Sequence, residues 1–176
     1  MSENLNVNHF RNGDIISEVK TAIEWIKAGE NEQPAWCYYH NDLSNGAKYG
    51  KLYNWYAVND PRGLAPEGWR VPTDAEWTEL TYYLTINGHI EIEGNALKSR
   101  SKWVRGKDAY GWNGLPGGNR SYNGNFDFVG SRGVWWSSSE ETKLDAWGRG
   151  LGHKSDPVYR SQGNKNFGFS VRCIKD

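Results

Sequence analysis

The sequence predicts an α+β domain, and three observations support this fold class. The first half contains two segments whose apolar side chains recur at helical spacing. The second half has no helical period, and its many Gly and Asn residues separate short runs that are typical of strands and turns. The composition, with 10 Trp, 10 Tyr and 21 Gly in 176 residues, favours an aromatic core over a bundle of aliphatic helices.

Length and charge limit the classes of protein that the chain can represent. A chain of 176 residues without a linker or a fixed-period repeat is expected to form one domain over residues 1–176. The 21 basic and 21 acidic residues balance, so no basic field indicates a nucleic-acid partner. No apolar run approaches the about 18 residues of a membrane span, and "MSENLNVNHFRNGD" has no apolar signal core. The localisation stays open between the cytoplasm, a phage virion and a cell surface reached with a leader since removed.

The first element in chain order is a helix near residues 17–28, within "SEVKTAIEWIKAGE". Ser17 can cap its start, and Gly29 is expected to end it. The spacing places three apolar side chains on one face, namely Val19, Ile23 and Ile26.

The segments that follow are predicted to be short and extended. "AWCYYHND" indicates a strand, and "NGAKYGKLYNWYAV" indicates a turn followed by a strand or an aromatic extended segment. The residues of "DPRGLAPEGW" are typical of turns.

The second helix is predicted over residues 74–84, in "VPTDAEWTELTYYL". Thr73 and Glu76 have the spacing of a capping box, so the carboxylate of Glu76 is expected to serve the helix end and not to act as a general acid. The buried stripe of the helix is expected to consist of Trp77, Leu80 and Leu84.

The second half is predicted to consist of short strands joined by turns, with "VWWSSS" as the clearest strand. "GFSVRCIKD" predicts a buried final strand with Phe169 and Val171 on one face and Ser170 and Arg172 on the other. Between Trp147 and Phe167 the sizeable apolar side chains are few, so this tract is expected to be an irregular surface loop.

No group of residues has the spacing of a catalytic or metal site. The four His residues include no pair at i,i+4, and no G-x-S-x-G surrounds a serine. "LPGGNR" lacks the G-K-[ST] of a phosphate loop. Cys37 and Cys173 are compatible with one disulfide or with two reduced core thiols. We therefore expect no enzyme activity, no cofactor and no metal.

Several motifs occur in a fixed order from Tyr49 to Cys173: "YGKLYNWYAV", "GLAPEGWRVPTDAEWTEL", "ALKS", "GLPGGNR", "GVWWSSSE", "AW" and "GFSVRC". Together with "FRNGD" and "PAWCYYHND" upstream, they resemble the Fibrobacter succinogenes major paralogous domain family over nearly the whole chain. The resemblance implies a C-type-lectin-like fold with two helices, a small twisted antiparallel β core and long irregular loops. The tryptophans inside these motifs are expected to be core residues: Trp55, Trp69, Trp77 and Trp136.

The resemblance does not imply catalysis. Related formylglycine-generating enzymes use two nearby reactive cysteines, whereas Cys37 and Cys173 are far apart in this chain. Iron-dependent relatives use a close His pair, and calcium-dependent lectins use E-P-N or W-N-D motifs; this chain has neither. The resemblance therefore implies a binding module for an unknown protein or glycan, such as a receptor-binding or adhesin-like domain, whose oligomeric state stays open.

Some proteins of this fold are the variable proteins of diversity-generating retroelements, in which template AAC codons become NNC codons. Many residues between about 145 and 167 are reachable from Asn in this way, and their fixed scaffold would be Trp147, Arg149, Leu151, Val158, Arg160 and Lys165. The side chains between would then differ without disturbing the core. The predicted binding face consists of Tyr122, Asn123, Asn125, Gly148, Arg149, Gly150, Gly152, His153, Ser155, Asp156, Tyr159, Arg160, Ser161, Asn164 and Asn166.

Three functional hypotheses follow from the sequence. The first is a display module with a hypervariable face. The second is an undiversified surface or structural domain of the same family, because an ordinary loop rich in Gly, Ser and Asn has the same composition. An enzyme of the formylglycine-generating type is the third. Arg149 and Arg160 are compatible with ligand contacts and with a role in supporting the tract.

Overall fold

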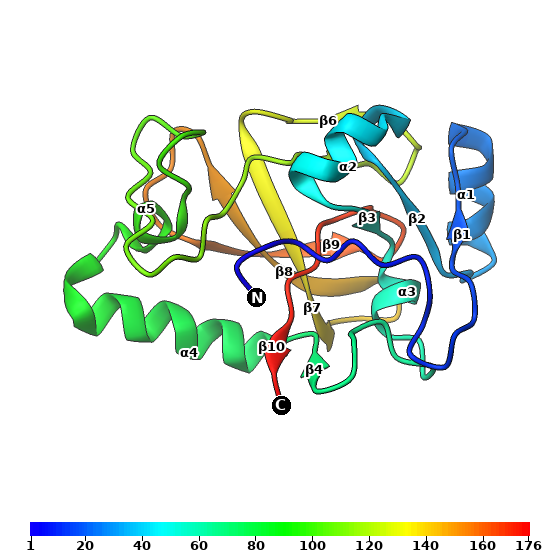
Figure 1. Cartoon of the computed structure of the whole chain (residues 1–176), viewed down its shortest axis with the longest axis horizontal. Helices are drawn as coiled ribbons and strands as arrows, with labels where there is room; N and C mark the ends of the chain where they lie inside the picture. Colours follow the sequence, from blue (N-terminus) through cyan, green and yellow to red (C-terminus); the bar gives the residue numbers. More distant parts are fainter.

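The computed structural model describes all of residues 1–176 and has an α+β architecture, as predicted. Its longest strands form an antiparallel sheet in the order β7-β8-β9, from β7 (Arg132–Glu140), β8 (Asp145–Gly152) and β9 (Tyr159–Asn164). The longest helix, α4 (Asp74–Leu84), lies along this sheet, and α1 (Ala22–Glu30) lies at the other end of the molecule (Figure 1). No helix has the length and apolar character needed to cross a membrane.

The smaller sheets tie distant parts of the chain together. β1 (Ser17–Glu18) pairs in parallel with β2 (Ala35–Cys37), which pairs antiparallel with β3 (Leu52–Tyr53). Two further antiparallel pairs join β4 (Trp69–Arg70) to β10 (Ile174–Lys175), and β5 (Asn119–Arg120) to β6 (Phe126–Asp127). The shorter helices are η1 (Tyr39–Asn41), α2 (Leu43–Tyr49), α3 (Trp55–Val58), η2 (Thr85–His89) and α5 (Glu93–Leu97).

The first predicted helix is displaced toward the C-terminus. α1 begins after Thr21, whose hydroxyl accepts from the Glu24 backbone N–H while the Glu24 carboxylate accepts from the Thr21 N–H. This capping box outcompetes Ser17, which lies in β1. The helix buries Trp25, Ala28 and Gly29, whereas Ile23 is 79 % exposed, so the predicted buried face was wrong. Gly29 lies inside the helix and does not end it.

The segment predicted as a turn and an extended run contains two short helices. Asp42 caps α2 by accepting from the Ser44 N–H, and Asn54 caps α3 by accepting from the Ala57 N–H. Only Leu52–Tyr53 between them is a strand. Side-chain caps of this kind can start a helix in a sequence without a long apolar period, which is why periodicity did not predict these elements.

The second predicted helix is confirmed with its predicted bounds. Thr73 and Glu76 form the capping box, and the carboxylate of Glu76 also contacts Arg70 at 2.5 Å. Trp77 and Leu84 are buried, and Leu80 is half-buried. The apolar stripe packs against the three-stranded sheet through Trp135 and Leu151.

The tract predicted to be an irregular loop forms two of the three strands of the main sheet. β8 occupies most of its first part, and β9 follows after a connection at residues 153–158. Ala146, Gly148 and Gly150 are buried, and so is the side chain of Lys165. The prediction failed because Gly-rich strands carry no apolar alternation, although their backbones complete the sheet.

The final strand prediction is correct about burial and wrong about its two faces. Residues 168–173 run extended beside β3 and β7, with isolated bridges Tyr53–Phe169 and Trp135–Ser170. Ser170 and Arg172 are buried like Phe169, because the segment is enclosed on both sides. The strand itself is short and forms only at Ile174–Lys175.

Three of the four tryptophans predicted to be in the core are buried: Trp55, Trp77 and Trp136. Trp69 is only partly buried, at the edge of the same cluster. Trp136 is fully enclosed, donates from its indole N–H to the Tyr53 carbonyl at 2.9 Å, and lies 4.2 Å from the Phe169 ring. The aromatic core predicted from the composition is therefore present.

We expect Trp136→Ala to lower the free energy of unfolding by about 3–5 kcal/mol, because it removes a large, fully enclosed side chain from the core. Trp69→Ala is the matched control and should cost clearly less, since its side chain is partly exposed. Urea unfolding followed by circular dichroism measures both values. Equal losses for the two variants would contradict this account of the core.

Candidate functional site

The alternation of side chains divides β8 and β9 into two faces of different character. Gly148 and Gly150 pair with Ser161 and Tyr159, so these residues share one face of the sheet. The other face carries Arg149 and its neighbours and turns toward α4. The predicted site residues are therefore split between two sides of the sheet.

The ring of Tyr159 packs directly on the glycines of β8. A Cβ at Gly150 would lie 2.2 Å from Tyr159 Cε2, and one at Gly152 would lie 3.2 Å from its hydroxyl oxygen. A Cβ at Gly148 would lie 3.0 Å from the Trp135 carbonyl oxygen. The glycines thus form a floor on which an aromatic side chain of the next strand lies flat, a recognised cross-strand pairing.

A groove runs along this face on both sides of Tyr159. One end is a cavity of about 530 Å³, which includes His153, and the other is a cavity of about 400 Å³, which includes Phe167. Both are lined by Phe128, Arg132 and Tyr159, and these two adjoining cavities are together called the Tyr159 groove. The remaining lining residues are Asn119, Ser121, Asp127, Ser131, Val134, Gly152, Lys154, Ser155, Ser161, Gln162, Gly163 and Phe169.

The rim of the groove combines an exposed aromatic ring with a cation. Phe128 is 46 % exposed, and the guanidinium of Arg132 lies 4.1 Å from its ring centre. The backbone of Phe128 has φ 66°, a conformation that is strained for a bulky residue. Strain of this kind concentrates at functional sites, so this residue is a candidate ligand contact.

The hydroxyl of Tyr159 stays protonated at neutral pH. Burial raises its pKa above the ordinary value of 10.0, and the nearby charge of Arg132 opposes this shift without reversing it. Tyr159 can therefore donate a hydrogen bond to a ligand while its ring supplies contact area. Arg132 and Lys154 make the 530 Å³ end cationic.

Arg149 and Arg160, both predicted site residues, support the sheet. Arg149 is 3 % exposed and donates to the Asp74 carboxylate at 2.5 Å, to the Asp74 carbonyl and to Thr78. Arg160 donates to the same carboxylate at 2.9 Å and lies over the Trp147 ring. One carboxylate at the start of α4 thus fixes two neighbouring strands, so neither arginine faces the groove.

The other predicted residues are dispersed around the sheet. Asp156 accepts from Arg105 at 2.6 Å, outside the groove. Asn166 packs against Gly29 of α1, where a Cβ would lie 2.4 Å from the Asn166 side chain. Asn164 accepts from the Asn166 backbone, and Asn123 accepts from that of Asn125.

Tyr122 is exposed, and its ring meets that of Phe167 at 5.7 Å, so it adjoins the groove at one end. The predicted residues that line the groove itself are Gly152, His153, Ser155, Tyr159 and Ser161. Sequence reasoning missed Phe128 and Arg132, because only the register of β7 and β9 on β8 brings the start of β7 and the residues before it close to Tyr159. The one available signal was an aromatic residue in the turn-rich "DFVGSRG".

No group of three or more His, Cys, Asp or Glu side chains is arranged to hold a metal ion. Cys37 and Cys173 are both buried as free thiols in separate clusters, so the disulfide alternative is not formed. Burial raises the pKa of Cys37 to about 12 and that of Cys173 to about 11.

We expect Gly150→Ala to destabilise the protein by about 1–3 kcal/mol, because the new methyl group must displace the Tyr159 ring. Gly152→Ala is the matched control and should cost less, since its Cβ would lie 3.2 Å or more from the nearest atoms of Tyr159 and Ser155. Thermal unfolding measures the stabilities, and the Tyr159 ring resonances in NMR spectra report its position. Unchanged ring resonances in Gly150→Ala would contradict the packing described.

We expect Asp74→Asn to cost about 3 kcal/mol, because it leaves the buried Arg149 guanidinium without its counter-charge. Burial alone would raise the pKa of Asp74, but hydrogen bonds from Arg160 and Arg149 outweigh it and hold the pKa below the ordinary 3.8. The stabilisation is therefore fully present above pH 3.8 and is lost as the pH falls through the lower, folded value.

Urea unfolding between neutral pH and pH 2.5 measures this dependence. The wild-type chain should lose more stability than Asp74→Asn over the acid range, so the difference between the two should shrink as the pH falls. Parallel curves would rule out the carboxylate as the source of the effect.

Comparison with known protein families matches residues 1–175 to one family, described as the Fibrobacter succinogenes major domain. No curated protein and no solved structure matches the sequence. The match spans the core, the three-stranded sheet and the Tyr159 groove alike. The chain therefore belongs to the Fibrobacter succinogenes major domain family.

Proposed function

We propose that this chain is a non-enzymatic binding module on a C-type-lectin-like fold, and that a protein or glycan ligand binds in the Tyr159 groove. The observation that carries the proposal is the groove itself, two adjoining cavities of about 530 and 400 Å³ on one face of the main sheet. Ligand sites of proteins are concave surfaces of this size with a few convergent polar groups.

The chemistry of the groove suits recognition of a polar surface. Tyr159 and Phe128 offer aromatic contact area, and Tyr has little conformational freedom to lose on binding. Ser161 and Asn119 add hydrogen-bonding groups along the floor, and Arg132 adds a cation beside them. A few aromatic and arginine side chains of this kind carry most of the energy in protein interfaces.

The buried cysteines support a role other than catalysis of the formylglycine-generating type. The thiols of Cys37 and Cys173 are enclosed in different clusters, and their raised pKa values keep them protonated at neutral pH. The thiolate is the reactive form of cysteine, so neither residue is prepared for attack on a substrate.

The glycine floor favours an undiversified module over a hypervariable one. Side chains at Gly148 and Gly150 would meet the Trp135 carbonyl and the Tyr159 ring, so these positions cannot differ freely. A retroelement could diversify only the groove positions whose side chains have room, namely His153, Ser155 and Ser161. A reverse-transcriptase gene and a template repeat beside the coding region would support the diversified alternative.

Replacing Phe128, Arg132 and His153 together by Ser should abolish ligand binding without unfolding the protein, because all three side chains are exposed on the groove. The labelled protein is applied to a printed array of bacterial and animal glycans and to a display library of random peptides. Ligands of the wild-type chain should bind the triple variant at least about tenfold more weakly, a loss of about 1.4 kcal/mol.

The matched control replaces three exposed residues elsewhere, Ile23, Lys143 and Leu144, by Ser. Its stability should change little, as is usual for surface substitutions, and it should bind like the wild-type chain. Ligands that bind the groove variant and the control equally would show that the binding face lies elsewhere. If the wild-type chain binds no glycan on the array and no peptide of the library, the structural-domain alternative is favoured.

A further inference from the structure

The cationic end of the Tyr159 groove lies where the main sheet carries glycine between two large side chains. Arg132 of β7 pairs with Gly152 of β8, and Tyr159 of β9 pairs with Gly150. Directly opposed residues of antiparallel strands share a face, so Arg132 and Tyr159 stand diagonally across the two glycines. Gly152 has no side chain to fill this space, and it lines the cavity of about 530 Å³ together with Arg132 and Tyr159.

Arg132 carries a charge that no group of the protein neutralises. It is exposed, no carboxylate lies within ion-pair distance, and its guanidinium makes no hydrogen bond. Every other arginine of the chain donates at least one side-chain hydrogen bond to a protein oxygen. The guanidinium of Arg132 lies instead 4.1 Å from the Phe128 ring centre, a contact that positions it and leaves its N–H groups without an oxygen acceptor.

Four further polar side chains line the same cavity without a hydrogen-bond partner in the protein: His153, Lys154, Ser155 and Tyr159. The unpaired polar atoms that the protein encloses belong to Trp77, Ser99 and Arg172, so the hydroxyls of Ser155 and Tyr159 are open to the cavity. Both side chains converge over one glycine, because a Cβ at Gly152 would lie 3.2 Å from the Tyr159 hydroxyl oxygen and 3.3 Å from Ser155 Cβ. No acidic side chain lines this cavity.

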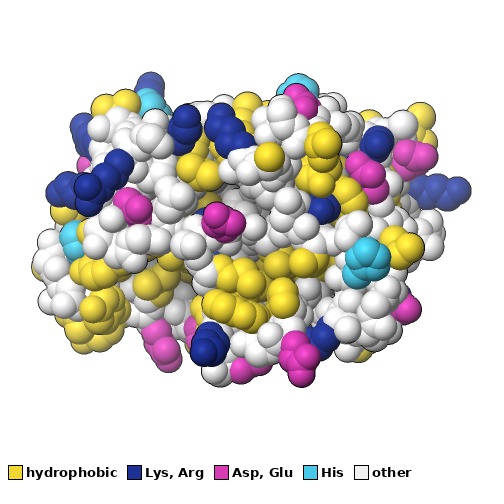
Figure 2. All heavy atoms as spheres, in the orientation of Figure 1, with side chains coloured by type: hydrophobic (Ala, Val, Ile, Leu, Met, Phe, Trp, Pro, Cys, Tyr) yellow, Lys and Arg dark blue, Asp and Glu magenta, His cyan; other side chains and the backbone are white.

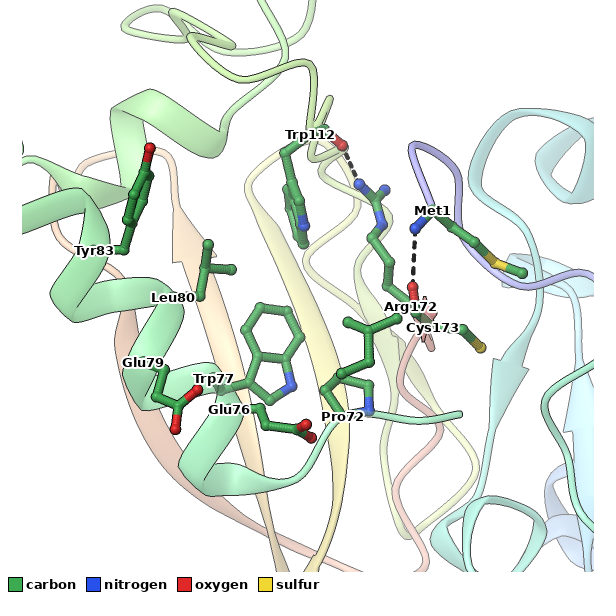
Figure 3. Close-up of a pocket in the computed structure, with 11 residues that line it drawn as sticks. Met1, Pro72, Glu76, Trp77, Glu79, Leu80, Tyr83, Trp112, Arg172 and Cys173 are labelled. Atoms are coloured by element: carbon green, nitrogen blue, oxygen red, sulfur yellow. Dashed lines mark hydrogen bonds between the residues drawn. The ribbon is translucent and has the colours of Figure 1, made fainter. Parts of the chain in front are cut away.

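The cavity on the α4 side of the sheet has the opposite arrangement. Figure 3 shows this cavity, of about 630 Å³, between α4 and the segment that carries Arg172. The guanidinium of Arg172 is buried, and it donates to the Trp112 carbonyl and to Asn4 Oδ1. Arg172 is therefore engaged within the fold, whereas Arg132 is available to a ligand.

A basic segment lies beside the connection between β8 and β9. Lys98 donates to the Ser155 carbonyl, and Arg105 donates to the Asp156 carboxylate at 2.6 Å. Residues 98–107 contain no acidic side chain, and their exposed basic side chains are Arg100, Lys102, Arg105 and Lys107. In Figure 2, Lys and Arg side chains gather at the upper left, where Figure 1 shows α5 and the β8–β9 connection. This positive field favours an anionic ligand and attracts one with several charges most strongly.

The backbone around the cavity favours a carboxylate over a phosphate. Phosphate sites commonly use several backbone N–H groups of a loop or of a helix start. Here the N–H of His153 donates to the Ser131 carbonyl at 2.8 Å, and the N–H of Ser155 donates to the Gly152 carbonyl at 3.2 Å. The available donors are therefore side chains, and the planar fork of Arg132 matches the two oxygens of a carboxylate.

The uncharged groups of the cavity suit a sugar ring. Phe128 is 46 % exposed at the rim, and an aromatic ring packs well on the C–H face of a pyranose. The hydroxyls of Ser155 and Tyr159 can each donate and accept, which matches the neighbouring hydroxyls of a sugar. An acidic peptide would use the cations but not this second set of groups.

We propose that the cationic end of the Tyr159 groove binds the carboxylate of an acidic sugar, a uronic or sialic acid residue within an oligosaccharide. The carboxylate accepts hydrogen bonds from the Arg132 fork, and Lys154 adds a second positive charge. The sugar ring packs on Phe128, with its hydroxyls toward Ser155 and Tyr159. This inference rests on the proposed function, because it names the ligand class of the same groove.

The test is calorimetric titration of the whole chain at pH 7 with matched probes. Trigalacturonate is compared with its methyl ester, which has the same sugars without charge, and with a capped tri-aspartate peptide, which has the same charge without sugar. The dissociation constant of trigalacturonate should be about 1 mM or tighter, and the ester and the peptide should bind at least about tenfold more weakly. 3′-Sialyllactose, measured beside lactose, covers the second class of sugar carboxylate, and the acid that binds more tightly identifies the source.

Arg132→Gln combined with Lys154→Gln removes both charges at exposed positions, so the variant should fold. It should bind the preferred acid at least about tenfold more weakly, with little change for the neutral counterpart. The matched control, Lys27→Gln combined with Lys143→Gln, removes the same net charge at exposed positions outside the groove and should bind like the wild-type chain. Arg132→Lys keeps the charge but removes the planar fork, and should also weaken binding of the acid.

Several outcomes would overturn the inference. They are equal affinity for the acid sugars and their neutral counterparts, equal affinity for trigalacturonate and the peptide, tighter binding of inorganic phosphate than of either acid sugar, and no binding of either acid sugar at millimolar concentration.

The same measurements separate this inference from the proposed function. If neutral glycans or peptides bind the wild-type chain but not the variant with Ser at Phe128, Arg132 and His153, while the acid sugars do not bind, the groove is a binding site and only the acidic-sugar inference fails. If no ligand of any kind depends on the groove, the proposed function fails as well.

Discussion

The segment from Gly168 to Cys173 holds the two halves of the molecule together. Phe169 exchanges both backbone hydrogen bonds with Tyr53 of β3, and Ser170 accepts from Trp136 and donates to Val134 of β7. Toward the N-terminus, the carbonyl of Val171 accepts from Leu5. The last core segment thus lies between strands formed much earlier in the chain, so the N-terminal sheet, the main sheet and the chain ends depend on the same few residues. Besides being paired on both edges, the segment is packed on both faces, which explains why Arg172 lies inside the protein.

The two faces of the main sheet differ in their contacts. On the α4 face, the carboxylate of Asp74 binds Arg149 and Arg160, so one helix start fixes β8 and β9. On the opposite face, glycines keep β8 flat, and the ring of Tyr159 fills the space that side chains would otherwise occupy. The ring of Tyr159 is therefore supported from below by strand backbone, whereas Phe128 and His153 at the rim come from connections between strands.

The sequence correctly predicted those elements whose defining residues lie within the element itself. The Thr73–Glu76 capping box and the apolar stripe of α4 lie within one helix, and "VWWSSS" is a short run of strand-forming and small polar residues within β7. The first helix was misplaced because Ser17 and Thr21 are both adequate caps, and the choice depends on pairing of β1 with β2. The groove was only partly predictable, since His153 and Tyr159 come from one tract but Phe128 and Arg132 reach it through strand register.

Strand β8 shows why an unpatterned tract is a poor indicator of a variable surface. Its glycines carry no periodicity, yet Gly150 is required where it stands, because the Tyr159 ring occupies the space of its Cβ, and the Trp135 carbonyl oxygen lies 3.0 Å from the would-be Cβ of Gly148. Gly163 of β9 follows the same rule, with the Phe169 ring 2.7 Å from its would-be Cβ. Glycines on one strand lie against large aromatic rings of a neighbouring segment. The sheet is therefore specified by pairs of residues and not by the pattern within one strand. Freedom to change is then confined to side chains with open space beside them, which in this sheet are those that border the Tyr159 groove.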